Sequence, residues 1–486
     1  AERRLLEQRL RQELRYRYGP RSERNATAPG QGLLFEGLPG ALLAAGSEPL
    51  PPGPASERLD SARPRKGKGR NGRRPLPPSL PRRKVILDFL EDERHCPGCG
   101  KPMQRIGEEV SEQLDYEPAT LFVRQTVRPK YACPTCQDGV LTAEPPAKPI
   151  ERGLPGPGLL AHVAVSKYAD HLPLHRQESI LARHGVELTR STLCDWMGEV
   201  ARLLEPIRDH MAREILAGMK VHTDDTPVPV REKGHRKTRE GRLWTYIGDA
   251  DHPYTVFDYT RTHARDGPQR FLGGYRGYIQ ADGYSGYDGC YARGATEVGC
   301  WAHVRRKFFD ARSTAPPRCE KALALIGRLY DVEREAHDRT PAERVAMRRE
   351  RSKPILAEIR SWLHAEARAV LPKSAVGGAI AYALNRWPAL VRFLEDGRLE
   401  IDNNRAERAL RAVVVGRKNW LFAGNDEGGR RAAIIYSLIA TCKEHAVEPF
   451  AYLRDVLQRL PTYRGNIADL TPPAWKRAHA RPDAAS

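Results

Sequence analysis

The chain has 486 residues, long enough for about three or four domains, and carries a formal net charge of +19. Such an excess of Lys and Arg indicates an acidic partner, usually nucleic acid, although it can also simply aid solubility. The sequence has no apolar run long enough to span a membrane and no apolar export segment, so we expect a cytoplasmic protein without membrane contact. Two Cys-x-x-Cys pairs among nine cysteines favour a reducing compartment.

The first 84 residues divide into a helical segment and a linker. Residues 1–24 are charged, with leucines four apart, and predict a helix that is too short to assign as a coiled coil. Residues 25–84 are rich in Pro, Gly and Ala and predict a linker. Its second half is a run of Lys and Arg without an acidic residue. We favour a flexible arm along DNA phosphates over a merely solvated tether.

Residues 85–150 contain two Cys-Pro-x-Cys turns, and each presents two thiolates to one metal ion. Together they predict a structural zinc site, because four thiolates leave no open position for a substrate. Redox pairs and unligated cysteines are the alternatives, but neither pair lies at a strand-to-helix junction. A basic strand is expected over residues 119–131. The four predicted zinc ligands are Cys96, Cys99, Cys133 and Cys136.

Residues 151–215 show a helical pattern throughout. One helix is predicted over 175–185, ending at Gly185, and a second over 189–204, with Thr189 or Ser191 as its N-cap. Two helices joined by a short turn that contains glycine are typical of a helix-turn-helix. Helical hairpins that bind nothing have the same pattern.

After residue 216 the pattern changes to short β-branched and aromatic segments separated by polar turns, which predict a mixed α/β sheet. This first part of the core, residues 216–315, is followed by a charged helical insertion over 316–395 and a second part over 396–445. Residues 446–486 are expected to form a helix and a loose tail. Strands are expected within 218–230, 241–250, 252–260, 276–288 and 296–311, the last running into a basic helix.

Two acidic residues lie at informative places in this region. Asp224 is within the first strand among apolar neighbours, and Asp282 lies where the fourth strand gives way to Gly283. An acid in a central strand is costly unless it is paired or bound to a metal. With Glu407 they could form a three-carboxylate site, and such oxygen ligands suit Mg2+ or Mn2+. An edge-strand acid and an Asx turn are the alternatives for Asp224 and Asp282.

The stretch IDNNRAERALR, residues 401–411, predicts the start of a helix with Asp402 as N-cap. Glu407 lies at the edge of an apolar stripe that we expect to pack inward. A surface Glu paired with Arg411 is the alternative interpretation of Glu407. The stripe comprises Ala406, Leu410 and Val413.

Side by side, these stretches resemble a transposase of the insertion sequence 66 family, and the resemblance runs over nearly the whole chain in family order. The matching motifs are RYGPRSER, the pair CPGCG and CPTC, HTDDTPV, DGYSGYD, GCWAHVRRKF, IDNNRAERALR, GRKNWLFAG and PFAYLRDVL. Each motif alone is weak, but the combination is highly specific.

The resemblance implies a multidomain α/β protein with a ribonuclease-H-like catalytic core that carries an Asp-Asp-Glu triad and a helical insertion before the Glu. By motif matching the triad is Asp224, Asp282 and Glu407. The family usually has Glu after the first Asp, where this sequence has Asp225. Alternation along a strand lets only one of Asp224 and Asp225 face the site, and the family motif selects Asp224.

The implied chemistry is DNA cleavage and strand transfer with two Mg2+ ions, or Mn2+, without a protein nucleophile. The implied partners are the terminal repeats of the element, target DNA, at least a second copy of the chain in a synaptic complex, and small accessory proteins. A zinc-dependent DNA-binding regulator with an inactive core, and a nuclease that cuts without joining, are the alternatives. His303 is a further candidate for phosphate binding, beside the residues we expect to position phosphates: Arg305, Arg306, Arg405, Arg408, Arg411, Arg417 and Lys418.

Overall fold

The computed structural model describes most of the chain after residue 146, and little before it. The N-terminal helix, the linker and the four predicted zinc ligands lie outside the described residues. The chain divides into two compact units, residues 1–34 with 128–486 and residues 35–127, and the description below concerns the first. The described residues are 121, 130–132, 140–142, 147–151, 153–232 and 234–480.

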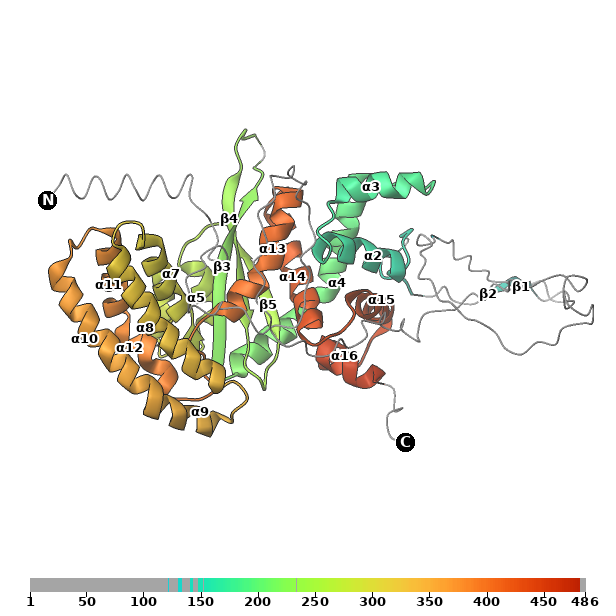
Figure 1. The fold of residues 1–486 in the computed structure, drawn as a ribbon. Helices are drawn as coiled ribbons and strands as arrows, with labels where there is room; N and C mark the ends of the chain where they lie inside the picture. Colours follow the sequence, from blue (N-terminus) through green and yellow to red (C-terminus); the bar gives the residue numbers. More distant parts are fainter. Residues whose placement is uncertain are drawn as a thin grey trace, which may run out of the picture. The chain divides into compact units, whose positions relative to one another are not determined.

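A five-stranded mixed sheet in the order β5-β4-β3-β6-β7 forms the centre of this unit (Figure 1). β3, β4 and β5 are antiparallel neighbours joined by short connections, whereas β6 and β7 run parallel to β3. Parallel neighbours need crossover connections, which here contain α5 (Asp266–Leu272) and α6 (Asp288–Tyr291). The predicted mixed sheet is confirmed. Its strands are β3 (Lys220–Val230), β4 (Arg239–Ile247), β5 (Thr255–Thr260), β6 (Tyr278–Gln280) and β7 (Thr296–Val298).

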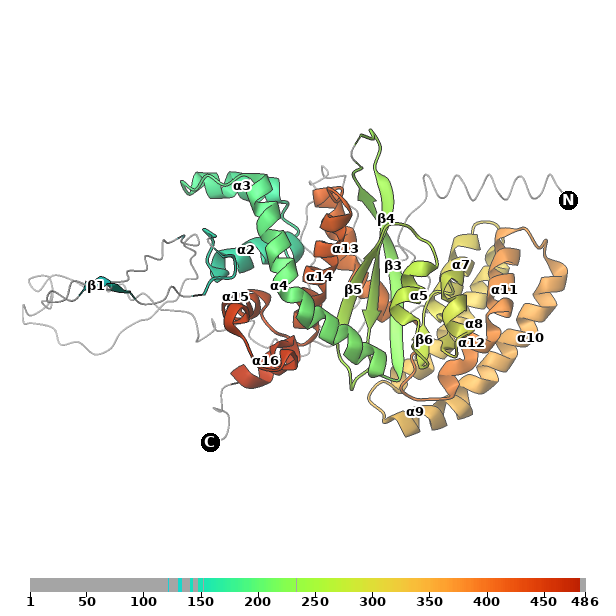
Figure 2. The same cartoon turned by 180° about the vertical axis from the view of Figure 1, so that it is seen from behind.

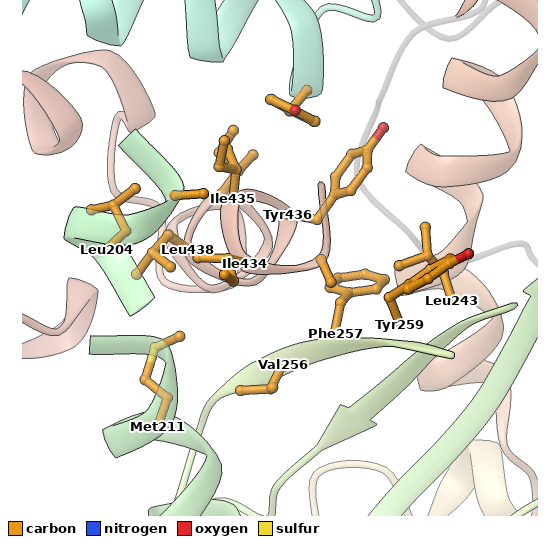
Figure 3. Packing of buried hydrophobic residues seen from close by; sticks show 14 of the residues in the cluster. Leu204, Met211, Leu243, Val256, Phe257, Tyr259, Ile434, Ile435, Tyr436 and Leu438 are labelled. Carbon is orange, nitrogen blue, oxygen red and sulfur yellow. The ribbon is translucent and has the colours of Figure 1, made fainter. Parts of the chain in front are cut away.

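Helix α14 (Asp426–Glu444) packs between α4 (Arg190–Ala217) and the edge strand β5. Its apolar residues contact both neighbours, so this helix is apolar on more than one side. Ser437 and Thr441 satisfy the free edge of β5, since their hydroxyls accept from the backbone N–H of Phe257 at 2.8 Å and of Thr255 at 3.1 Å. Figure 3 shows the apolar contact between Leu204 and Met211 of α4, Val256 and Phe257 of β5, and Ile434, Ile435 and Leu438 of α14.

The predicted helical hairpin is present as α3 (Leu174–Arg183) and α4 (Arg190–Ala217). Gly185 adopts φ +74°, which favours glycine, and the Thr189 hydroxyl caps α4 by accepting from the N–H of Thr192 at 3.3 Å. The predicted end of the second helix at residue 204 is wrong. The helix continues through Pro206 to Ala217 because Ile207, Met211 and Ile215 extend its buried stripe.

A second apolar core lies where the helical insertion packs against α7 (Trp301–Ala311). Figure 2 shows the insertion helices and the α4–α14 layer on opposite sides of the sheet. The buried Arg348 closes the insertion: it pairs with Glu333 at 2.6 Å and donates to the carbonyl oxygens of Phe393 and Leu399. The insertion helices are α8 (Pro316–Glu335), α9 (Pro341–Met347), a π-helical turn (Arg348–Ser352), α10 (Lys353–Ala369), α11 (Ala375–Asn385) and α12 (Trp387–Val391).

The C-terminal region is more ordered than the sequence predicted. After α15 (Pro449–Arg459), residues expected to form a loose tail instead form α16 (Pro472–His479). The indole N–H of Trp475 donates to Asp455 of α15 at 2.8 Å, which fixes the two helices together. Within the part of the chain that the structure describes, no helix is long and apolar enough to cross a membrane.

A short antiparallel pair precedes the helical region. β1 (Lys130–Ala132) pairs with β2 (Val140–Thr142), so the strand predicted over 119–131 reaches the described residues only at its end. In the sequence, Cys133 and Cys136 lie in the connection between these strands. Their own placement is outside the described residues, and the zinc site stays a prediction here.

Candidate active site

Asp224 and Asp282 lie at equivalent places on neighbouring parallel strands. His222 of β3 is in register with Gln280 of β6, and each aspartate lies two residues further along the chain, Asp224 within β3 and Asp282 just past the end of β6. Side chains two residues apart in a strand share a face, so the register carries both carboxylates to the same face. β6 ends before Asp282, and the backbone turns at Gly283 with φ +86°.

The Asp282 carboxylate also makes the Asx turn that the sequence left open as an alternative. It accepts from the backbone N–H of Tyr284 at 2.9 Å. This bond orients the carboxylate and still leaves acceptor capacity on its oxygens, because an ionised carboxylate has about four lone-pair sites. A local turn and a role in a carboxylate site are therefore compatible.

Helix α13 (Asn404–Trp420) brings the third carboxylate over the sheet. The expected inward stripe of this helix is confirmed, since Ala406, Leu410 and Val413 are all buried. Asp402 as N-cap is wrong: Asn403 occupies that position. Asp402 lies one residue before the N-cap. Its carboxylate accepts from the backbone N–H of Asn404 at 3.0 Å.

Glu407 lies at the edge of the buried stripe and is about one-third exposed, at 33%. Its carboxylate is 3.8 Å from Nε2 of His303 in α7. Among the described residues, the Glu407 carboxylate pairs with His303, and the alternative pairing with Arg411 is not found.

Electrostatics indicate that the three acids share one site. The pKa of Asp224 is raised to about 8, first by burial and then by the nearby carboxylates of Asp282, Asp225 and Glu407, against one backbone hydrogen bond that lowers it. A buried carboxyl group beside like charges binds either a proton or a cation. Oxygen donors of this kind fit a hard divalent cation, so the residues present suit such an ion.

Within the described residues, no three His, Cys, Asp or Glu side chains are arranged to hold one metal ion. An ion that takes part of its coordination from a substrate and from water needs fewer protein ligands.

Asp225 faces other partners. Its carboxylate accepts from Arg242 of β4 at 3.0 Å and lies 3.1 Å from Nε2 of His263. The alternation along β3 thus separates the two neighbouring aspartates, with Asp224 near Asp282 and Glu407 and Asp225 in a separate ion pair.

The helical insertion contacts the Asp282 turn directly, which the sequence did not reveal. The hydroxyl of Tyr382 in α11 donates to the backbone oxygen of Asp282. Arg386, which directly follows α11, packs against Gly283, where an added Cβ would lie 2.5 Å from the guanidinium Nε. The glycine is therefore required both by its positive φ and by the close approach of Arg386.

Sequence reasoning also missed a buried polar network beside the acids. His222 and Asn403 are both fully buried, and their side chains are 3.0 Å apart. One signal was available: a histidine two residues before Asp224 shares its strand face, so a polar side chain was predictable next to the carboxylate.

The expected phosphate-binding residues fall into three groups. Arg306, Arg408, Arg411 and Lys418 are exposed. Arg305 and His303 are half-buried on α7, and the other two side chains are held within the protein. Arg405 pairs with Glu444 at 2.6 Å, and Arg417 donates to the carbonyl oxygen of Pro227 in β3.

This chain belongs to the IS66 family of transposases. The model described as "Transposase IS66 family" matches residues 152–431, which include the sheet, the insertion and α13. The zinc-finger binding domain of transposase IS66 matches residues 93–137, the IS66 C-terminal element matches 437–472, and a further model, "Transposase C of IS166 homeodomain", matches 5–85. The resemblance inferred from the motifs is confirmed. The protein is a transposase with DNA as its partner, and its domains imply divalent-metal and zinc use.

Similar proteins extend over most of the chain. The uncharacterized protein y4hP of Sinorhizobium fredii is 34% identical over 501 residues, covering 97% of this chain and 88% of its own length. The uncharacterized protein y4jD of the same organism is 36% identical over 421 residues, covering 82% of this chain and 81% of its own length. A third, y4qI, is 39% identical and covers 77% of this chain and 72% of its own length.

Proposed function

We propose that this transposase binds the ends of its own insertion sequence and catalyses DNA cleavage and strand transfer through Asp224, Asp282 and Glu407. The observation that carries this proposal is the convergence of three carboxylates from β3, the end of β6 and α13, reflected in the raised pKa of Asp224. These residues are about 180 positions apart in sequence at most, so only the fold brings them together.

The topology supports a ribonuclease-H-like core. Three antiparallel strands are followed by two strands parallel to the first, in the order β5-β4-β3-β6-β7, and a helical insertion precedes α13. Fold alone does not define a reaction, so the proposal rests on the carboxylate site and on the family.

In this proposal Asp224, Asp282 and Glu407 would together hold two divalent cations, Mg2+ or Mn2+. When bound, the ions supply activation of the attacking oxygen and stabilisation of the charge on the leaving oxygen. The chain contributes orientation: β3 and β6 fix the two aspartates in register, and α13 places Glu407 against them. Asp225 remains in its ion pair with Arg242 and does not take part.

The reaction has two steps. Water first attacks a phosphodiester at the element end, which breaks the P–O bond and leaves a free 3′-hydroxyl. That hydroxyl then attacks a target phosphodiester, forming one P–O bond and breaking another, with a target 3′-oxygen as leaving group. No protein nucleophile is required for either step.

Exposed cations would position the DNA backbone. We propose Arg306, Arg408, Arg411 and Lys418 as phosphate contacts, with His303 and Arg305 beside them on α7. Arg405 and Arg417 are assigned a different role, because their contacts with Glu444 and Pro227 fix α13 to neighbouring elements. Phosphate contacts set the register of the DNA without reading its sequence.

The remaining assignments complete the proposal. Cys96, Cys99, Cys133 and Cys136 would hold a structural zinc ion in a module over 85–150. The helix-turn-helix-like region over 151–215 would contribute to end recognition, and the core would comprise 216–315 and 396–445 around the insertion over 316–395. Joining two ends calls for at least a dimer, and small accessory proteins are further proposed partners.

The test is a strand-transfer assay with the purified full chain, Mg2+ and pre-cut terminal repeats from the DNA that flanks its gene. We expect wild type to join the ends, and Glu407→Gln to bind them without joining. A mutant that joins pre-cut ends at the wild-type rate would overturn the assignment of Glu407. Binding without cutting by wild type would favour a regulator with an inactive core, and cutting without joining would favour a nuclease.

A further inference from the structure

Asn403 occupies a fully buried position between β3, α7 and the start of α13, and each of its polar groups has a partner. Its side-chain N–H donates to the backbone oxygen of Thr223 at 2.8 Å, and its Oδ1 lies 3.0 Å from Nδ1 of His222. Its backbone N–H points to Sγ of Cys300 at 3.2 Å, at the N-cap of α7. A single residue therefore connects three elements.

The partners determine how the amide and the imidazole are oriented. The carbonyl oxygen of Thr223 can only accept, so the nitrogen of the Asn403 amide must face it. The amide oxygen then faces His222, and Nδ1 of His222 must carry the hydrogen in this contact.

The other side of the His222 ring faces a second set of groups. Its Nε2 is 3.4 Å from the carboxylate of Glu400, which also pairs with Lys220 at 3.2 Å. Gln280 of β6 donates to the backbone oxygen of Glu400 at 2.5 Å. Through Glu400, the segment that leads into α13 is thus bound to β3, which contains Asp224, and to β6, which ends just before Asp282.

These contacts lie immediately beside the proposed carboxylate ligands. Thr223, which accepts from Asn403, directly precedes Asp224, and Asn403 lies one helical turn before Glu407. The Asn403 side chain therefore joins the peptide before Asp224 to the start of the helix that carries Glu407. Buried polar groups bonded in this way hold their geometry, because leaving any of them unpaired is costly.

We propose that Asn403 and His222 are positioning residues that set the distance between Asp224 and Glu407, with the contact between Asn403 and Nδ1 of His222 as the essential link. This inference rests on the proposed function of the three carboxylates. Neither residue touches DNA or a metal ion in the proposal. Both act by fixing the peptides that bear the ligands, and the Glu400 side of the ring serves only to attach the segment.

Two substitutions at His222 distinguish the contact of Nδ1 with Asn403 from the contact of Nε2 with Glu400. The amide nitrogen of Asn can take the place of Nδ1, whereas that of Gln can take the place of Nε2. His222→Asn therefore keeps the donor toward Asn403 and loses the contact with Glu400, and His222→Gln does the reverse. The two variants are matched in chemistry, and both leave some space unfilled in the buried site.

The experiment measures the strand-transfer rate on pre-cut ends against Mg2+ concentration for wild type, His222→Asn, His222→Gln and Glu407→Gln, with end binding and thermal unfolding in parallel. We expect His222→Gln to raise the half-saturating Mg2+ concentration, or lower the rate, by about 10- to 100-fold, as changes beside metal ligands commonly do. His222→Asn should retain most of the rate, and both should bind ends normally.

If the two His222 variants lose strand-transfer activity only to the extent that their unfolding temperatures fall, the inference is overturned and His222 has a purely structural role. If His222→Gln is unfolded under the assay conditions, Asn403→Leu tests the same link, because it nearly keeps the shape of the side chain and removes the acceptor toward Nδ1 of His222 together with the donor to Thr223. An unchanged Mg2+ dependence in Asn403→Leu would overturn the inference. Inactive wild type together with normal end binding would instead count against the proposed function.

Discussion

The hydroxyl of Tyr382 in α11 donates a hydrogen bond to the backbone oxygen of Asp282, although 100 positions separate the two residues in the sequence. The insertion therefore contacts the turn that bears one of the three acids. Arg386, directly after the end of α11, packs against the same turn at Gly283. The insertion supports the site in addition to forming its own core.

Tyr382→Phe tests this relationship. Removing the hydroxyl leaves the Asp282 carbonyl without this donor, so we expect a loss of about 1 kcal/mol in unfolding free energy and a several-fold slower strand transfer. Urea denaturation and the transfer assay measure the two effects. Tyr463→Phe is the matched control, because it removes a hydroxyl bond to the backbone oxygen of Asn466 in the exposed C-terminal region. Equal transfer rates in both variants would contradict the role of Tyr382.

The pKa of Asp224 predicts how stability depends on pH without divalent ions. The folded-state pKa of about 8 lies above the ordinary value of 3.8, so the folded protein binds more protons than the unfolded chain between these values. Stability contributed by this group is therefore lost as pH rises from about 4 to about 8, and changes little above that. Thermal unfolding in a chelator should show a lower unfolding temperature at pH 8 than at pH 6.

Asp224→Asn should make this fall smaller, since the amide does not titrate. Mg2+ should stabilise the wild type more at pH 8 than at pH 6, because the cation competes with the proton for the same carboxylate. A pH dependence that is identical in wild type and Asp224→Asn would show that other groups cause it.

Cys133→Ser tests the zinc site. A four-thiolate structural site loses its metal when one ligand is removed, so we expect the variant to release about one zinc per chain and to bind ends more weakly. Metal analysis of the purified protein measures the first effect. Cys194→Ser is a suitable control, because Cys194 is an exposed free cysteine on α4. Unchanged zinc content in Cys133→Ser would exclude the four-cysteine site.

Arg348 is expected to be a major contributor to the stability of the insertion. Arg348→Met leaves Glu333 and three backbone oxygens without their donor, and breaking a buried pair in this way costs about 3–5 kcal/mol. The double variant Arg348→Met with Glu333→Leu removes both charges and should recover part of the loss. Chemical denaturation of the three proteins measures the difference, and a double variant less stable than Arg348→Met would contradict this account.

Local patterns in the sequence were sufficient for the elements that form the core. The alternation and β-branched content of residues 218–260 gave three strands, and the stripe of Ala406, Leu410 and Val413 gave the buried face of α13. Such signals are local because side-chain periodicity follows directly from strand and helix geometry. The motifs, taken in order, also led to the family and to the three acids.

Element ends and side-chain partners were determined by contacts between distant residues. α4 continues past residue 204 because its buried stripe extends against β5 and α14, and α16 forms where Trp475 reaches Asp455. Arg405 and Arg417 resembled free phosphate contacts in the sequence, yet neighbouring elements supply them with Glu444 and a carbonyl of β3.

The sequence by itself determined the types of residue in the site: three acids, a basic helix and a polar start to α13. Only the tertiary structure decided which groups meet, including Asp224 with Asp282 and Glu407, Asp225 with Arg242, and Asn403 with His222. The physical reason is that hydrogen bonds and ion pairs act over a few ångströms, while residues that form them in this site lie as far as 181 positions apart, from His222 to Asn403. Local pattern fixes which face a side chain occupies, and the packing of strands and helices fixes what it faces.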